Sequence, residues 1–444
     1  MRFLNFLCVV IAMQAPTIAS SDDQIVIISP HRHSVQQEII PLFKEHYQKK
    51  YGKKVEVEWL DQGGASDDLR YILARFASQS ATSGIDLFWG GGEQPHLELK
   101  KLKLLKSHLL PSHLKKEVPA KLGPLLLYDK EETWHAVNFS SFGLFFNKKL
   151  LRLLQLEEPK NWNDLADPRY FGHLSNADPR RSSSYLTIYT VMMQSSGWDK
   201  GWALLTRIAA NTNKFSHSSS APVKAVVAGE AAAAPSIDYF ALAKIGDLGV
   251  QNLGFHLPID VSIVNADPIS MLKGAPHPIP AGRFIEFLLD AEVQKLFILP
   301  MGAKDGPRFS SLGRLAVNKK TYADTENRRI TQLNPYTLAP PKFVLNRDQA
   351  TDIQFVLSDL IGAVLIDSHK ELRQATEVLI KTKRFAELEK GLFPVKKEEV
   401  TSAVKKWGDQ RFRNQMINHW LEQAHLSYQK IVKDADMKGA VAPQ

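Results

Sequence analysis

The chain has 444 residues, and its 56 Lys and Arg against 47 Asp and Glu give a formal net charge of +9. This length predicts two or three domains. The basic residues are spread along the chain without a nucleic-acid-binding motif, so we expect a solvated basic surface or the uptake of a small anion rather than nucleic-acid binding. The single cysteine, Cys8, excludes disulfides, cysteine zinc sites and a cysteine nucleophile from the residues that follow it.

Residues 1–19 have the pattern of an export signal. Arg2 precedes a mainly apolar run at 3–12, and Thr17, Ile18 and Ala19 resemble a cleavage site. This run is too short to span a bilayer, which takes about 20 residues; a buried N-terminal helix is the alternative. We therefore expect a mature chain that begins near Ser20 and resides in the periplasm. No later apolar run has the length of a membrane span.

Strands and helices alternate after this signal. Apolar or alternating runs predict strands at 24–29, 54–60 and 85–89, and the helical spacing of apolar residues predicts helices after the first two. This order predicts a parallel sheet with helices on both faces. Further strands are expected at 134–140, 142–147, 173–177, 231–237, 255–257 and 262–265, with helices between most of them.

The strand predicted at 85–89 ends directly in Gly90, Gly91 and Gly92, which Glu93 follows. In open α/β sheets, ligands bind at the carboxyl ends of strands, and glycine lets the backbone turn sharply and approach a ligand closely. We expect these four residues to line a ligand site. A plain tight turn is the alternative.

Three further loops precede predicted helices and carry guanidinium, imidazole, hydroxyl and phenol groups. Basic side chains and free N–H groups at a helix start suit an oxyanion, and imidazole or phenolate can also bind a metal. Each loop also has a plainer interpretation, as a solvated cap, a run of capping serines or an aromatic packed at a lobe edge. The candidates are His31, Arg32 and His33 in the first loop, Arg180, Ser182 and Ser183 in the second, and Ser219, Asp238 and Tyr239 in the third, with Ser141 as a further one.

From residue 323 the chain becomes more charged and helical. Apolar periodicity predicts helices within 353–366, 371–380 and 404–431, and residues such as Ile353, Val356 and Leu357 form an apolar stripe. We expect a helical extension that packs on a lobe and does not line the ligand site.

Taken in order, several motifs are similar to those of a known family. They are 85–92 (IDLFWGGG), 161–171 (NWNDLADPRYF), 177–180 (ADPR), 197–202 (GWDKGW), 237–239 (IDY), 267–276 (DPISMLKGAP), 283–288 (RFIEFL) and 313–317 (GRLAV). Over about 24–322 the chain resembles the periplasmic substrate-binding proteins of ABC importers, in the branch that includes ferric-ion-binding proteins.

The resemblance implies a type II periplasmic-binding-protein fold, with two α/β lobes that clamp a ligand between them. Lobe 1 would comprise 20–133 and 266–322, lobe 2 would comprise 134–265 with hinge crossings near 134–140 and 257–265, and the extension would comprise 323–444. The implied partners are an ABC transporter permease and a small ligand. We expect a monomer without a resident cofactor.

The resemblance leaves two ligand classes open. Ferric binders of this branch typically use a histidine, a glutamate and two adjacent tyrosines. Here the second tyrosine is replaced by Phe240, and the glutamate position falls in the glycine run. An organic anion, phosphorylated or carboxylated, is therefore slightly favoured over Fe³⁺, and an iron–anion chelate would combine the two. Residues for the iron alternative would be His31, His33, Glu93 and Tyr239.

The chain lacks the motifs of the main hydrolase classes. Neither G-x-S-x-G nor H-E-x-x-H occurs, and no pair of carboxylates stands in a motif context. We therefore expect ligand binding without turnover, in the service of transport. A component that presents its ligand to a membrane kinase is the alternative, and a secreted hydrolase is a weaker one.

Overall fold

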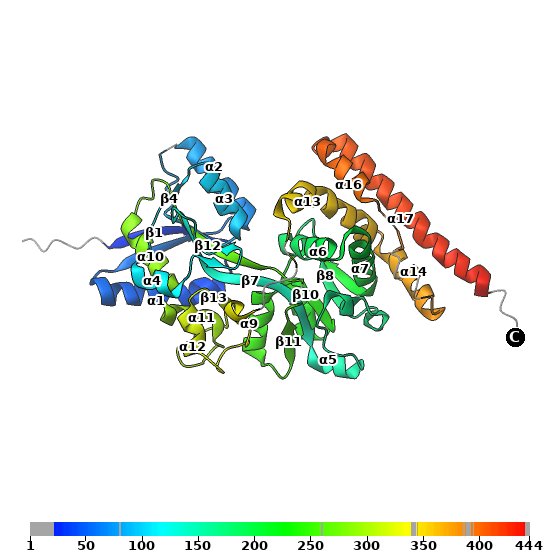
Figure 1. The fold of residues 1–444 in the computed structure, drawn as a ribbon, viewed down its shortest axis with the longest axis horizontal. Helices are drawn as coiled ribbons and strands as arrows, with labels where there is room; N and C mark the ends of the chain where they lie inside the picture. The colour runs from blue at the N-terminus through cyan, green and yellow to red at the C-terminus, as the bar shows by residue number, and fades with distance from the viewer. Residues whose placement is uncertain are drawn as a thin grey trace, which may run out of the picture.

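Two α/β lobes and a C-terminal group of helices make up the chain (Figure 1). The computed structural model describes residues 22–439 apart from 80, 259–260, 339–342, 344, 385–386, 388–391 and 394, so the predicted export signal lies outside the described residues. The predicted fold class, mixed α/β with two lobes and a helical extension, is confirmed.

The first lobe is built on parallel strands β1 (Asp23–Ile28), β2 (Val55–Leu60) and β3 (Leu87–Trp89), as the alternating pattern predicted. After each strand comes a helix: α1 (His33–Tyr51), α2 (Ala65–Ser78) and α3 (Glu93–Lys101). In α1, Val35, Ile39 and Phe43 are fully buried on one face. The remaining elements of this lobe are β4 (Leu105–Lys106), α4 (Ser112–Glu117), β5 (Lys121–Leu122), β6 (Leu125–Leu126), α10 (Pro278–Leu289), α11 (Ala291–Ile298), β13 (Leu315–Ala316) and α12 (Lys319–Asp324).

One long strand, β7 (Trp134–Asn147), runs from the first lobe into the second. The sequence predicted two strands here, but the run is continuous, and all of its residues except Asn147 are buried. Its first part pairs with β12 (Val264–Leu272) in the first lobe, and its second part pairs with strands of the second lobe. Because both lobes share β7, a change in their relative position must bend this strand or its neighbours.

The second lobe carries strands on the far part of β7 and helices around them. At Gly143 in this part of β7, an added Cβ would lie 2.4 Å from the carbonyl oxygen of His256, so only glycine lets the two strands pair this closely. Its elements are α5 (Lys148–Leu153), η1 (Trp162–Ala166), η2 (Pro168–Tyr170), β8 (Leu174–Ala177), α6 (Ser183–Ser196), α7 (Trp198–Asn211), β9 (Thr212–Ser216), α8 (Ala221–Ala228), β10 (Ala233–Ile237), α9 (Asp238–Leu248) and β11 (Leu253–His256).

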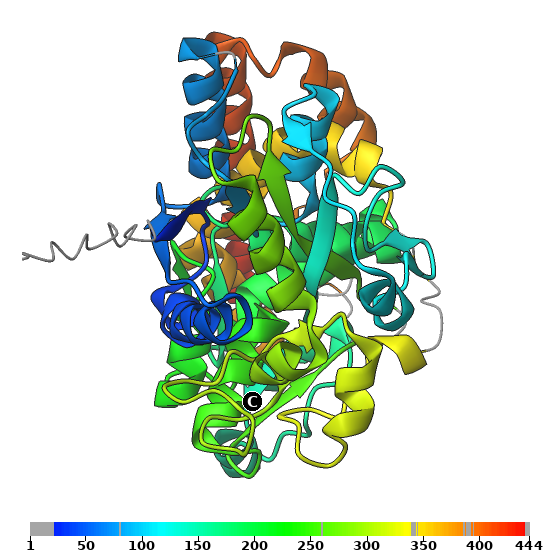
Figure 2. The same cartoon turned by 90° about the vertical axis from the view of Figure 1, so that its left-hand side faces the viewer.

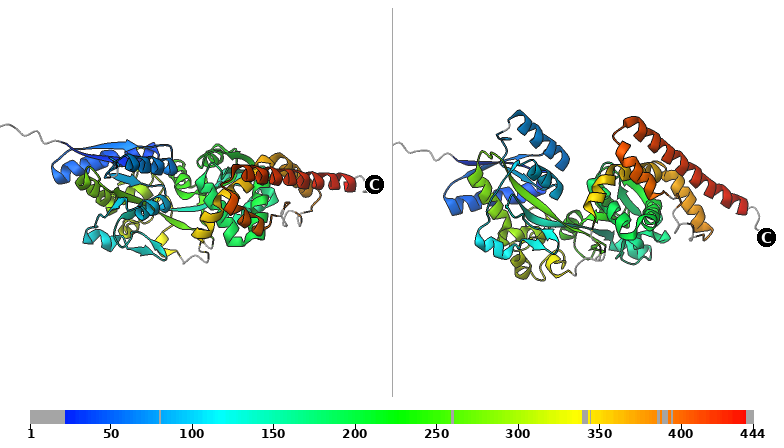
Figure 3. Two further views of the ribbon diagram at one scale, coloured as in Figure 1. Left: turned by 90° about the horizontal axis from the view of Figure 1, so that it is seen from above. Right: turned by 45° about the horizontal axis from the view of Figure 1, so that its top comes forward.

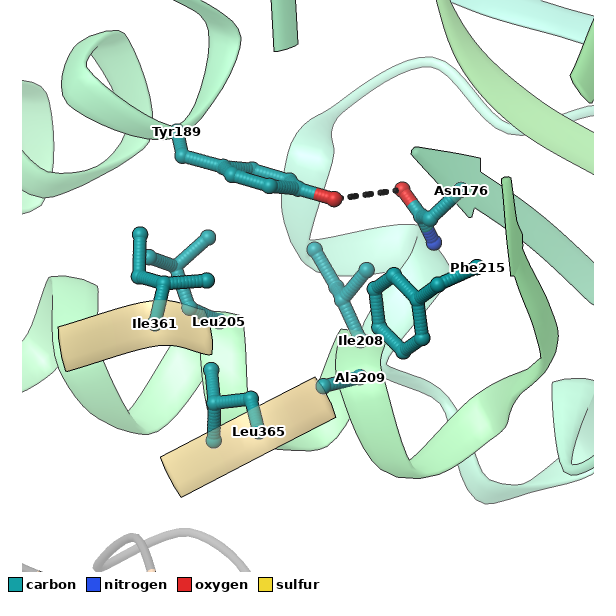
Figure 4. Close-up of a pocket in the computed structure, with 8 residues that line it drawn as sticks. All are labelled: Asn176, Tyr189, Leu205, Ile208, Ala209, Phe215, Ile361 and Leu365. Atoms are coloured by element: carbon teal, nitrogen blue, oxygen red, sulfur yellow. Dashed lines mark hydrogen bonds between the residues drawn. The ribbon is translucent and has the colours of Figure 1, made fainter. Parts of the chain in front are cut away.

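The C-terminal helices, called the extension, pack against the second lobe and share one apolar core with it (Figure 1). Figure 2, viewed from the side of the first lobe, shows the orange and red helices of the extension at the top. Figure 4 shows Ile361 and Leu365 of the extension beside Leu205 and Ile208 of α7, around a small interior cavity. After η3 (Pro335–Thr337), its elements are α13 (Arg347–Ile361), the π-helical turn η4 (Gly362–Asp367), α14 (His369–Lys381), α16 (Lys397–Ala403), η5 (Val404–Lys406) and α17 (Gln410–Gly439).

Helical residues Gln349–Asp367 of the extension are long and apolar enough to cross a membrane, by length and composition alone. The sequence predicted no such run after the export signal, and this was wrong. In the structure, 61% of an 18-residue stretch within this segment is buried. Core helices have the same composition, and this one lies in the core shared with α6 and α7.

Removing core contacts of the extension should destabilise the whole second lobe. Leu357 of α13 is fully buried, whereas Phe355, two residues earlier, is 67% exposed. We expect Leu357→Ala to lower the free energy of unfolding by about 2–5 kcal/mol because it leaves a cavity. Phe355→Ala is the matched control and should change it by about 0.5 kcal/mol or less. Urea unfolding measures both, and equal effects would contradict the shared core.

Candidate functional site

A cavity of about 570 Å³ lies between the two lobes. Five helices bring their first turn, or for α1 its N-cap residue, to it, and each follows a strand in the chain: α1, α2, α3, α6 and α9. The first-turn N–H groups of a helix have no partner within the helix, and the helix dipole is positive at this end. This convergence favours a negatively charged ligand. The residues that line the cavity from these turns include Arg32, Ser66, Glu93, Ser183 and Tyr239.

The glycine run divides into two parts. Gly91 and Gly92 line the cavity, but Gly90 does not. An added Cβ on Gly90 would lie 2.7 Å from the imidazole of His31, so this glycine makes room for a side chain rather than for a ligand. All three have φ between 75° and 96°, the left-handed region that favours glycine. The buried His96 holds the turn, with its Nε2 2.9 Å from the Gly90 carbonyl oxygen.

Asp267 of β12 is the buried centre of the first-lobe side of the cavity. Its carboxylate accepts hydrogen bonds from His31 Nε2 and Arg314 Nη1, both at 2.9 Å, and from the amide of Gly92 at 3.4 Å. Burial alone would raise the pKa of Asp267, but these neighbours together lower it well below its usual value, so the group is ionised.

His31 is therefore a structural partner of Asp267 rather than a free ligand group. Burial and the nearby charge of Arg314 lower the pKa of His31, so the ring is neutral at pH 7 and donates from Nε2 to the carboxylate. Its other nitrogen, Nδ1, lies 3.0 Å from the hydroxyl of Ser29. Although His31 lines the cavity as predicted, both ring nitrogens are already engaged.

Two guanidinium groups face the cavity over aromatic rings. Arg32 lies 4.9 Å from the ring centre of Phe240, and Arg314 lies 4.4 Å from that of Tyr239. Among the described residues, Arg32 forms no ion pair with a carboxylate, and the Nε atoms of both arginines are buried without a hydrogen-bond partner. Burial, and then the charge of Arg314, lower the pKa of Arg32. An anion placed between these cations would relieve their repulsion.

The second lobe contributes hydroxyl and amide groups. Ser183 and Ser184, the first two residues of α6, line the cavity together with Ser219. Ser182 lies behind them, where its hydroxyl caps α6 at the amide of Tyr185 and lies 2.8 Å from that of Ser219. Ser182 is therefore a cap and not part of the cavity wall.

Arg180 does not reach the cavity, contrary to the sequence prediction. Its guanidinium forms ion pairs with Asp178 at 2.7 Å and with Asp367 of the extension at 2.8 Å. Gly362 gives it room, because an added Cβ there would lie 2.6 Å from the guanidinium. Arg180 thus joins the loop after β8 to η4, and its charge is neutralised by two carboxylates.

Asp238 and Ser141 also lie behind the cavity wall. The carboxylate of Asp238 is fully buried and accepts hydrogen bonds from the amide and the hydroxyl of Ser141, both at 2.8 Å. This pair ties the start of α9 to β7. His33 is exposed at the start of α1 and is also absent from the cavity lining.

The structure thus brings a subset of the predicted site residues to the cavity. Those that line it are His31, Arg32, Gly91, Gly92, Glu93, Ser183, Ser219 and Tyr239, and those that do not are His33, Gly90, Ser141, Arg180, Ser182 and Asp238. The four residues named for Fe³⁺ do not form one set, because His33 points elsewhere and His31 is held by Asp267. Within the part of the chain that the structure describes, no group of three or more His, Cys, Asp or Glu side chains could hold a metal ion.

Sequence reasoning missed several residues at the cavity. Arg314 and Asp267 lie in the motifs GRLAV and DPISMLKGAP, which supported the resemblance but were not assigned to the site. The helical extension was expected to stay away from the cavity, and this was wrong. Thr351 and Gln354 of α13 line it.

Part of the chain matches a known family. Residues 102–301 match the family model for bacterial extracellular solute-binding proteins. The predicted resemblance is thereby confirmed. Over 228 residues the chain is 32% identical to the phosphoglycerate transport regulatory protein PgtC of Salmonella typhimurium, a match that covers 49% of this chain and 53% of that protein. The chain therefore spans about half the length of this curated relative.

Solved structures of periplasmic binding proteins share the two-lobed fold. The binding protein P5PA matches with a TM-score of 0.56 and 19% identity, over 77% of this chain and 98% of that one. AfuA from Actinobacillus pleuropneumoniae, with fructose-6-phosphate bound, matches at 0.53 and 21%, over 68% and 86%. Iron-bound HitA from Pseudomonas aeruginosa matches at 0.54 and 19%, over 77% and 99%. At these identities the likeness shows the fold alone.

The buried Asp238 should make stability depend on pH. Burial raises the pKa of Asp238 to about 7, above its value in the unfolded chain, so between about pH 4 and pH 7 the folded protein holds a proton that the unfolded chain has lost. Its contribution to stability is therefore present at the acid end and is lost as the pH rises through 7. From about pH 4 to pH 7, we expect the free energy of unfolding of the wild type to fall by up to about 4 kcal/mol relative to that of Asp238→Asn. Urea titrations at several pH values measure this, and parallel curves would contradict it.

Proposed function

We propose that this chain is an exported binding protein that captures a small phosphorylated anion between its lobes and presents it to a membrane partner without turnover. The observation that carries this proposal is the pair of guanidinium groups at the cavity, of which Arg314 is buried and Arg32 is half-buried. Arg32 has no carboxylate partner among the described residues and is repelled by Arg314. A phosphate accepts paired hydrogen bonds from guanidinium groups and would supply the countercharge that Arg32 lacks, whereas Arg314 is already paired with Asp267.

The rest of the cavity supports a phosphorylated ligand over other anions. Five helix N-termini and the hydroxyls of Ser183, Ser184 and Ser219 offer many donors, which suits the several acceptor oxygens of a phosphate. A relative at 32% identity is named for phosphoglycerate transport, and AfuA, a structure of similar fold, has fructose-6-phosphate bound. The iron alternative has less support, because the predicted metal ligands do not converge.

The membrane partner is either an ABC transporter permease or a signalling receptor. The family match and the fold favour delivery to a permease, since solute-binding proteins serve importers. The name of the relative, a transport regulatory protein, favours the second candidate, in which the loaded protein controls the synthesis of a transporter. Deleting the gene would distinguish them. If uptake of the ligand survives when the transporter genes are expressed from an unrelated promoter, the chain is a regulator, and if uptake is lost, it is the delivery component.

Arg32 should dominate the affinity for a phosphorylated ligand. We expect Arg32→Gln to weaken binding of 3-phosphoglycerate by about 30-fold to several-thousand-fold, because it removes a charged partner of the phosphate. His33→Gln is the neighbouring control, since His33 is exposed and outside the cavity lining, and should bind normally. Isothermal titration calorimetry with inorganic phosphate, 3-phosphoglycerate, glucose 6-phosphate and ferric citrate measures both.

Two outcomes of these titrations would overturn the proposal. One is tight binding of ferric citrate with no response to any phosphorylated compound. The other is equal affinity of the wild type and Arg32→Gln for a phosphorylated compound that binds, which would remove the arginine from the site.

A further inference from the structure

The extension reaches the cavity through α13. Residues Leu345, Ala350, Thr351 and Gln354 line the cavity, on the side that α6 also forms. The family match ends at residue 301, before α13 begins, and the match to P5PA covers 98% of that protein but only 77% of this chain. This wall of the cavity therefore lies outside the part of the chain that the family model describes.

Several contacts fix α13 to the second lobe. The side chain of Gln194 in α6 bonds to the backbone of Asn346, donating to its carbonyl at 3.1 Å and accepting from its amide at 2.9 Å. Ile353 and Leu357 are buried in the shared core. Asp359 accepts a hydrogen bond from Arg413 at 2.7 Å, which ties α13 to the start of α17. The wall therefore moves with the second lobe as one body.

The two sides of the cavity differ in charge. The first lobe supplies every charged side chain of the lining, the guanidinium groups of Arg32 and Arg314 and the carboxylates of Asp267 and Glu93. The lining side chains of α6 and α13 are all neutral, and their polar groups are serine and threonine hydroxyls and the amide of Gln354. In Figures 1 and 3, α13 faces α3 of the first lobe, and Gln94 of α3 lines the same cavity. Closure of the lobes would bring Gln354 towards the ligand and towards α3.

We propose that Thr351 and Gln354 form a specificity wall that contacts the uncharged, hydroxylated part of a phosphorylated ligand. The inference rests on the proposed function, in which the arginines of the first lobe hold the phosphate. Neutral donors and acceptors such as an amide and a hydroxyl pair with sugar or acid hydroxyls without the cost of burying a further charge. A phosphate without a carbon skeleton would not reach this wall.

Calorimetry with three probes tests the wall. The probes are inorganic phosphate, 3-phosphoglycerate and glucose 6-phosphate, titrated into the wild type, Gln354→Ala, Thr351→Val and the outer-face control Phe355→Ala. We expect at least one organic phosphate to bind about 3- to 10-fold more weakly to the two wall variants, as the loss of a neutral hydrogen bond implies. Inorganic phosphate should bind all four proteins equally.

The affinities of the four proteins for the three probes distinguish a failure of the specificity wall from a failure of the proposed function. If the wild type binds the organic phosphates but the wall variants bind every probe as the wild type does, or lose affinity for all probes equally, the wall is wrong and the proposed function stands. If the wild type binds none of the probes, the proposed function fails, and the ligand class named for the wall fails with it.

Cross-linking tests the position of the wall without any ligand. The protein that begins at Ser20 contains no cysteine of its own, so the pair Gln94→Cys and Gln354→Cys can be joined selectively by a short bismaleimide. We expect this pair to cross-link several-fold faster than the control pair of Gln94→Cys with Phe355→Cys, because only Gln354 lines the cavity with Gln94. Equal rates would overturn the placement of α13 as a wall that closes on the first lobe.

Discussion

The candidate site depends on one buried carboxylate. Asp267 sits on β12, which pairs with β7, and it holds together three segments that are distant in sequence: the loop after β1 through His31, the glycine run through Gly92, and the loop before β13 through Arg314. A buried charge is costly unless it is paired and fully hydrogen-bonded, so these partners must stay in place for the carboxylate to be tolerated. The first-lobe side of the cavity is thereby assembled before any ligand arrives, and a ligand binds without paying to order it.

The extension is the second feature on which the molecule depends. A helical segment added to a two-lobed fold could be a separate appendage, but here it completes the core of the second lobe and adds a wall to the cavity. The ion pairs of Arg180 with Asp178 and Asp367 link the two parts at the loop that leads into α6. The position of α6, and hence of Ser183 and Ser184, is therefore coupled to the packing of the extension.

Much of the fold could be predicted because local patterns agree with it. The alternation of strands and helices around 24–89 and the apolar stripe of α13 are signals carried by neighbouring residues. The site was harder to predict, because residues were assigned to it when they lay at the predicted start of a helix. That reasoning found Arg32, Gly92 and Ser183, but it also chose Arg180, whose partner Asp367 lies 187 residues away. It missed Arg314 because this residue lies before a short strand, β13, and not at a helix start. Only the tertiary fold shows that Arg314 pairs with Asp267 while Arg180 pairs with two other carboxylates.

The two lobes contribute different kinds of group to the cavity, charged in one lobe and neutral in the other. The charged groups of the lining all lie in the first lobe: Arg32 and Arg314 over aromatic rings, with the carboxylates of Asp267 and Glu93. The second lobe and α13 offer neutral donors and acceptors. Charge attracts an anion over a distance and with little regard to its shape, while neutral hydrogen bonds form only at contact and in the right geometry. Under the proposed function, capture is therefore the work of the first lobe, and discrimination among similar anions occurs when the second lobe closes over the part of the ligand that carries no charge.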